Sequence, residues 1–208
     1  MVLENFLNKI RKNCLHFNKG DFSPRYGLAE ATIIFCAWSI PAYFFVWIIH
    51  WLSKYMAAEY FNKAIAEGIG PHLWNIMGVF GFSLFGMSLM FPTSKFLSLI
   101  ANRVLVNTYA LGSLMFGLLL GQISSRFLTA SLEKWSRWLN VGGFFVLVFI
   151  LVFGINFFAW YLSFLIYNRN GKSLFLEKAK RMDLSCRVCF GLVVIIVPIC
   201  LMFARIKA

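Results

Sequence analysis

Five long apolar runs, almost free of charged residues, occupy most of this chain between residues 33 and 203. A helix that crosses a bilayer needs about 20 mainly apolar residues, because each residue rises about 1.5 Å and the hydrocarbon core is about 30 Å thick. A soluble domain of 208 residues could not bury this much apolar surface, since 60% of the residues are hydrophobic and the mean hydropathy is +0.74. The sequence therefore predicts an all-α, polytopic membrane helical bundle with five transmembrane helices, at 33–53, 73–91, 104–123, 139–167 and 184–203.

The segments outside these runs are short, so we expect residues 1–208 to form a single membrane domain. Residues 1–27 are predicted to form a basic amphipathic segment, which either lies in the inner headgroup layer or docks on a cytosolic partner. Apolar residues also recur at helical spacing over 127–139, which indicates a short amphipathic helix in the outer interface. Residues 93–102 are apolar enough to lie along the membrane surface, and residues 174–182 are expected to form a short helix.

The net charge of +12 is distributed unevenly, and Lys and Arg prefer the cytoplasmic side of a membrane. With five spans and a cytoplasmic N-terminus, thirteen of the twenty Lys and Arg residues lie inside. The chain has no Asn-x-Ser/Thr sequon, which fits a bacterial inner-membrane protein. An alternative with four spans would make the third run re-entrant or flat and would place the basic loop Asn168–Asp183 outside.

Small residues recur at every fourth position of the third run, at Ser113, Gly117, Gly121 and Ser125. Such a row forms a groove that lets another helix backbone approach closely, and this approach drives helix association in lipid. The groove either associates with a second copy of the chain or holds another helix of the same chain.

Asn156 lies near the middle of the fourth run. An unpaired amide in hydrocarbon costs a few kcal/mol, so Asn156 needs a hydrogen-bond partner. We expect it to bond to a neighbouring helix, with a pore-lining or switching role as the alternative.

Catalytic and metal-binding patterns are absent from the sequence. The C-x-x-C pair Cys186 and Cys189 would lie on the reducing cytoplasmic side without a second pair to pass electrons to, which favours plain packing over redox chemistry. Two imidazoles, His50 and His72, are too few for a metal site without a third ligand. We therefore expect no enzymatic activity, no cofactor and no metal. Direct nucleic-acid binding is not expected either, because orientation and anionic lipid account for the basic segments.

Two functions fit this pattern. The first is an inner-membrane subunit that forms a homo-oligomer and recruits a cytosolic protein partner. The second is a pore formed by oligomerisation, with Asn107, Ser113, Gln122 and Asn156 facing its lumen. For the first function, the residues predicted to contact the partner or membrane lipid are Lys9, Arg11, Lys12, Lys172, Lys178, Lys180 and Arg181.

In its size, its basic N-terminal helix, its polytopic layout and its lack of a catalytic set, the chain resembles the membrane component of Kiwa, a two-gene bacterial phage-defence system. The resemblance covers the whole chain as a layout, and it departs from that family in having five predicted spans instead of four. It implies an oligomeric sensor, a tetramer, that recruits a DNA-binding cytosolic partner. Membrane proteins of colicin immunity, exclusion and conjugation share the same layout.

Overall fold

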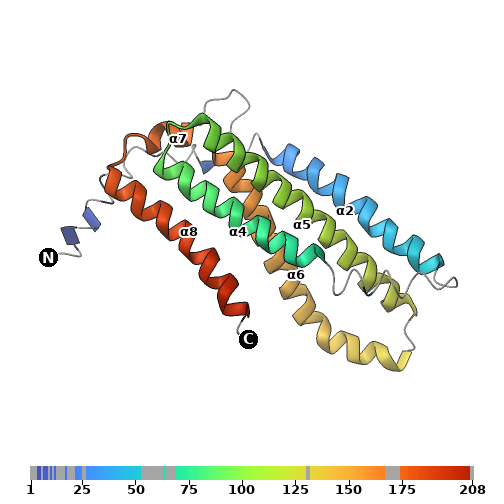
Figure 1. The fold of residues 1–208 in the computed structure, drawn as a ribbon. Coiled ribbons are helices and arrows are strands. Elements are labelled where there is room, and N and C mark those ends of the chain that lie inside the picture. The colour runs from blue at the N-terminus through green and yellow to red at the C-terminus, as the bar shows by residue number, and fades with distance from the viewer. Residues whose placement is uncertain are drawn as a thin grey trace. The chain divides into compact units, whose positions relative to one another are not determined.

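The structure is a computed structural model in which every described element is a helix, so the all-α prediction is confirmed over that part of the chain. It describes residues 4–5, 7–8, 10, 12, 17, 22–24, 27–52, 63, 69–129, 132–166 and 174–206. The helices are α2 (Leu28–Trp51), α4 (Ile69–Met90), α5 (Lys95–Thr129), α6 (Leu132–Ile166), α7 (Leu174–Ala179) and α8 (Leu184–Ile206) (Figure 1).

Four stretches of helix are long and apolar enough to cross a membrane. They are Leu28–Trp51, His72–Met90, Lys95–Ser125 and Phe149–Ile166, in α2, α4, α5 and α6. The apolar stretch described in α8, Leu184–Cys200, is shorter, although the helix continues to Ile206. The fifth span therefore stays a prediction, and the first four runs lie on helices that are long and apolar enough to cross a membrane.

The helices extend further than the apolar runs, and this corrects three expectations. The third run lies within the unbroken helix α5, which is long and apolar enough to cross a membrane, so it does not form a re-entrant segment. Residues from Lys95 onward belong to the same helix instead of a surface segment. The amphipathic helix expected over 127–139 is divided between the end of α5 and the start of α6. The reason is that no proline occurs between Pro92 and Pro198, so little stops a helix from continuing into its polar flanks.

The connection between α4 and α5 is a tight turn set by local chemistry. Pro92 disfavours a helical conformation at Phe91, and α4 ends at Met90. The Ser94 amide donates to the Phe91 carbonyl at 3.0 Å and closes the turn. The Ser94 hydroxyl then accepts a hydrogen bond from the Leu97 amide at 3.3 Å, which is the geometry of a helix N-cap. These contacts fix where α5 begins.

The chain divides into two compact units, which are described separately. Because α4, α5 and α6 each contribute residues to both, the units are not consecutive domains. Unit 1 comprises Met1–Leu28, Asn75–Asn107 and Ala159–Ala208, and unit 2 comprises Ala29–Trp74 and Thr108–Phe158.

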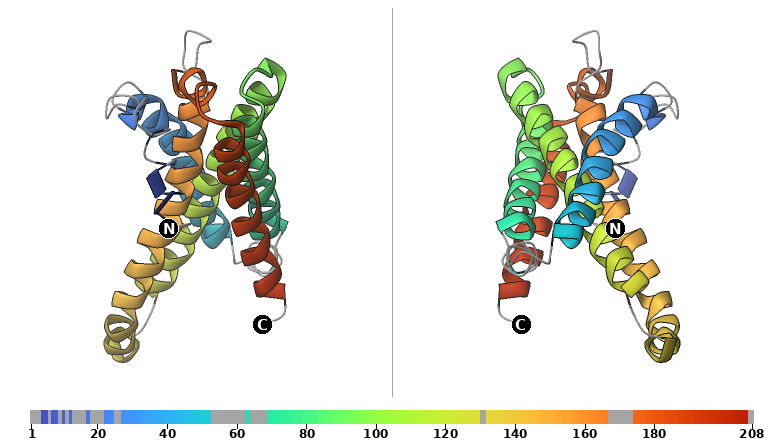
Figure 2. Two further views of the ribbon diagram at one scale, coloured as in Figure 1. Left: turned by 90° about the vertical axis from the view of Figure 1, so that its left-hand side faces the viewer. Right: turned by 90° about the vertical axis from the view of Figure 1, so that its right-hand side faces the viewer.

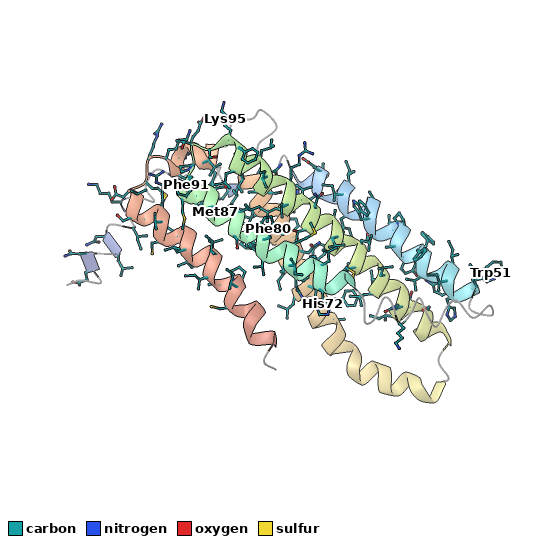
Figure 3. All side chains as sticks on the ribbon, viewed as in Figure 1. Trp51, His72, Phe80, Met87, Phe91 and Lys95 are labelled. Carbon is teal, nitrogen blue, oxygen red and sulfur yellow. The ribbon has the colours of Figure 1, made fainter. Side chains whose placement is uncertain are left out.

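Unit 1 has a continuous apolar core, and α4 and α8 lie side by side in it (Figure 2). The two helices cross at Gly86 and Gly191. A Cβ atom at Gly86 would lie 2.6 Å from the Gly191 carbonyl oxygen, and one at Gly191 would lie 2.7 Å from the Gly86 carbonyl oxygen. Outside this crossing, large side chains of α4 such as Phe80 and Met87 are exposed, as is Phe91 directly after the helix (Figure 3). The buried core residues are Leu84, Phe85, Ala101, Leu105, Ala159, Leu162, Leu165, Ile166 and Leu176.

In unit 2, one face of α2 packs along α5 (Figure 1). Rings from three helices meet beside this contact, with Phe116 of α5 between Phe35 of α2 and Phe149 of α6 at centroid distances of 5.4 and 5.0 Å. The buried residues of α2 recur at helical spacing and mark the packed face: Ala31, Ser39, Ala42, Val46 and Ile49.

Candidate functional sites

The small-residue row of α5 is covered by α2 of the same chain. A Cβ atom at Gly117 would overlap the backbone of Ser39, and a Cβ atom at Gly121 would lie 2.8 Å from Cβ of Val46. Ser125 is buried like the two glycines. The row therefore packs within the chain, which was the second of the two interpretations. Self-association through this row does not fit the structure, because α2 already fills the groove.

Asn156 is buried in unit 2 and bonds to groups from two other helices. Its Nδ2 donates to the Tyr109 carbonyl at 3.1 Å and to the Ser113 hydroxyl at 3.4 Å. Its Oδ1 accepts from Nε1 of Trp74 at 3.4 Å. A Cβ atom at Gly112 would overlap this amide, so glycine is what allows the close approach. The sequence predicted that Asn156 needs a hydrogen-bond partner. The positions of the apolar runs did not indicate that this partner would be Trp74 or Tyr109.

Further polar contacts join α2 to α5. The Tyr109 hydroxyl donates to the Ala31 carbonyl at 3.1 Å, and Nε1 of Trp47 donates to the Ser124 hydroxyl at 3.2 Å. Ser113, which the sequence placed in the small-residue row, also donates back to the Tyr109 carbonyl at 2.8 Å. Polar side chains here serve helix packing.

The four polar residues proposed to face the lumen of an oligomeric pore lie in different surroundings within one chain. Ser113 and Asn156 are buried and bonded to each other within unit 2. Nε2 of Gln122 is covered and lacks a hydrogen-bond partner among the described residues. Asn107 is exposed and belongs to unit 1. Within one chain, two of the four residues are therefore used in packing, and the oligomeric pore stays a prediction.

A basic turn follows α7 and is held by the core of unit 1. Leu176 and Ala179 are buried, and the next amides bond back to the helix: Lys180 to the Leu176 carbonyl at 3.0 Å and Arg181 to the Lys178 carbonyl at 3.0 Å. Lys178 is half-buried, whereas Lys180 and Arg181 are exposed. Of the other predicted contact residues, Lys12 is exposed, and Lys9, Arg11 and Lys172 lie outside the described residues.

The N-terminal segment contacts α7 and α6 of its own chain. The rings of Phe17 and Phe22 lie 5.5 and 6.0 Å from the ring of Phe175, and the Tyr161 hydroxyl donates to the Phe22 carbonyl at 2.8 Å. Phe17 belongs to the apolar face that the sequence assigned to lipid or to a partner. The sequence did not indicate that these two rings would pack on another aromatic residue of the same chain, Phe175 of the short helix α7.

Replacing Tyr161 by phenylalanine should loosen the N-terminal segment and leave the helices intact. The change removes one hydrogen bond and keeps the ring, so the stability cost should be about 1 kcal/mol or less. Limited proteolysis of the purified protein should show faster cleavage before Gly27. Ser98→Ala is the control, because its hydroxyl bonds only within α5 at an exposed site. Equal cleavage rates in wild type and Tyr161→Phe would show that this bond does not hold the segment.

Cys186 is buried and Cys189 is exposed, and both are free thiols on α8. Among the described residues, no group of three or more His, Cys, Asp or Glu side chains gathers where it could hold a metal ion. Comparisons with protein-family models, with curated proteins and with solved structures find no match.

Proposed function

We propose that the chain is a multi-pass subunit of a bacterial inner membrane, without enzymatic activity, that presents a fixed basic turn to an acidic surface of a cytosolic protein. The observation that carries this proposal is the turn at Lys180 and Arg181. Both side chains are exposed, while Leu176 and Ala179 of the helix before them are buried and the turn backbone is closed by hydrogen bonds. A partner that binds there would not have to order a loop, and preorganisation of this kind favours binding.

The charge distribution supports a cytoplasmic location for this turn. The N-terminal segment contacts α7 directly, through Phe17 and Phe22, so these two basic parts of the chain share one end of unit 1. With the basic end inside, the chain follows the preference of Lys and Arg for the cytoplasmic side.

The same proposal includes a homo-oligomer, in which the contact between copies uses a face other than the covered glycine row. Gly154 of α6 is a small residue that remains open, since a Cβ atom there would meet no atom within 4 Å. It lies among exposed apolar side chains that include Leu151, Ile155 and Phe158. The resemblance to the Kiwa membrane component supports an oligomer, a tetramer, and a DNA-binding partner with a role in phage defence.

Charge reversal at the turn tests the proposal. The double variant Lys180→Glu and Arg181→Glu should weaken capture of the cytosolic partner by about tenfold or more, because like charges then face each other across the contact. Capture is measured by affinity purification from native cells at matched expression, with quantitative mass spectrometry. Lys63→Glu is the control, because this exposed lysine lies in the segment predicted to face outward.

The membrane orientation of each variant is checked with reporter fusions at the C-terminus. If the double variant keeps its orientation and still captures its partner at the wild-type level, the basic turn is not the recognition surface. Loss of capture in Lys63→Glu as well would also contradict the proposal.

A further inference from the structure

A cavity of about 400 Å³ lies in unit 1, between the N-terminal segment, α4, α7 and α8. This volume is within the range of small-molecule sites, about 300–1,000 Å³. Arg187 is the one charged residue in the lining. The other lining residues are apolar: Phe17, Phe22, Leu89, Phe175, Ala179, Met182, Phe190 and Val194.

The arginine is the informative member of this lining. Nε of Arg187 is covered by protein and has no hydrogen-bond partner among the described residues. A guanidinium group carries five N–H donors and is always charged, so burying part of it beside apolar walls is unfavourable without an acceptor. Among the described residues that line the cavity, none is a carboxylate that could serve as that acceptor. The site is therefore complementary to a molecule that combines an anionic oxygen group with an apolar body.

The position of the cavity along α8 indicates what kind of apolar group the ligand carries. Arg187 lies in the first turn of the helix, and Val194 lies seven residues further on, about 10 Å along the axis at 1.5 Å per residue. One leaflet of the hydrocarbon core is about 15 Å deep. On the outer side of the same helix, Val193 and Val197 are exposed and apolar, as residues facing lipid tails are. The cavity thus runs from the level of the headgroups into one leaflet.

We propose that this cavity binds an anionic phospholipid, with its phosphate on Arg187 and one acyl chain along the apolar lining at Leu89, Phe190 and Val194. The inference rests on the membrane location proposed above and is independent of the cytosolic partner. The lipid would contact the N-terminal segment through Phe17 and Phe22, and it would contact α7 through Phe175 and Ala179. Bound lipid therefore stabilises the packing of the two elements that carry the basic end of the chain.

The test measures phosphatidylglycerol bound to the purified, full-length protein in a mild detergent, by native mass spectrometry during a lipid titration. Wild-type protein should retain one phosphatidylglycerol more tightly than phosphatidylcholine, since the charge-assisted bond to arginine favours a net anion. Arg187→Gln should weaken retention of phosphatidylglycerol by about tenfold. Arg103→Gln, which removes an exposed arginine of α5 that does not line the cavity, should stay within about twofold of wild type because surface charges contribute little.

Val194→Trp provides a second variant that keeps the arginine and fills the cavity. It should also lose the lipid, and its helical content by circular dichroism should match that of wild type. Three results would each overturn the proposal: equal retention of the two lipids with no effect of Arg187→Gln, displacement by inorganic phosphate alone, or wild-type retention in Val194→Trp. None of these results bears on partner capture at Lys180 and Arg181, so failure of this inference is distinguishable from failure of the proposed function.

Discussion

Replacing Gly117 by leucine should lower the free energy of unfolding by about 3 kcal/mol, at the upper end of the usual range for overpacking. The added side chain would overlap the backbone of Ser39, and backbone cannot rotate away as a flexible side chain can. To make room, α2 must move off α5, and the ring contact between Phe35 and Phe116 beside the glycine would be strained. Unfolding of the purified protein in bicelles by added SDS measures the change.

Gly154→Leu is the matched control for this prediction. It places the same side chain on a helix at a position where a Cβ atom meets nothing within 4 Å, so its stability should change by less than about 0.5 kcal/mol. The two variants also distinguish helix packing within one chain from association between copies of the chain. If Gly154 lies in the contact between copies, Gly154→Leu changes the mass of the detergent-solubilised particle and leaves its stability nearly unchanged. Equal stability losses in both variants would show that α2 does not occupy the Gly117 groove.

Gly112→Ala should cost about 2 kcal/mol, because its methyl group would overlap the Asn156 amide and lie 2.6 Å from Nε1 of Trp74. Asn156→Ala alone should cost about 1–2 kcal/mol, since it removes the acceptor for Trp74 and the donor to Tyr109. The double variant should lose at least about 1 kcal/mol less than the sum, because the shortened side chain at 156 leaves space for the methyl group.

This double-mutant cycle is measured by the same SDS titration. Gly112→Ala combined with Trp47→Phe is the control pair, because Trp47 bonds to Ser124 and does not contact Gly112 in the described structure. Its two stability losses should add within about 0.5 kcal/mol. Additive losses for Gly112 and Asn156 would mean that the amide does not lie against that glycine.

The placement of four apolar helices follows from the sequence, because hydropathy over about 20 residues is a strong signal and each backbone polar group in lipid must bond within its helix. Four of the predicted runs lie on helices that meet the requirement for length and composition. Helix ends were less predictable. The sequence suggested a surface segment over 93–102 and a separate helix over 127–139, yet the residues from Lys95 onward belong to α5, and 127–139 is divided between the end of α5 and the start of α6. No proline follows Pro92 in α5 to interrupt its backbone bonds.

For the candidate sites, the sequence predicted which residues take part but not which residues they contact. Glycine spacing predicted a groove on α5, and an isolated amide predicted a buried partner for Asn156. Neither pattern contains the identity of the opposite helix, because Ser39 lies 78 positions before Gly117 and Trp74 lies 82 positions before Asn156. The spacing of residues along the sequence also gave no indication of the cavity beside Arg187, because residues from four separate elements line it.

The hydrogen bond between Tyr161 and Phe22 joins residues 139 positions apart, and this has a consequence for biosynthesis. At about 5–20 residues per second, the ribosome adds Tyr161 about 7–28 s after Phe22. During that interval the phenylalanines of the N-terminal segment have been made, while α7, which carries Phe175, has not. For most of its synthesis the emerging chain therefore contains Phe17 and Phe22 without the residues of α6 and α7 that they contact in the folded protein.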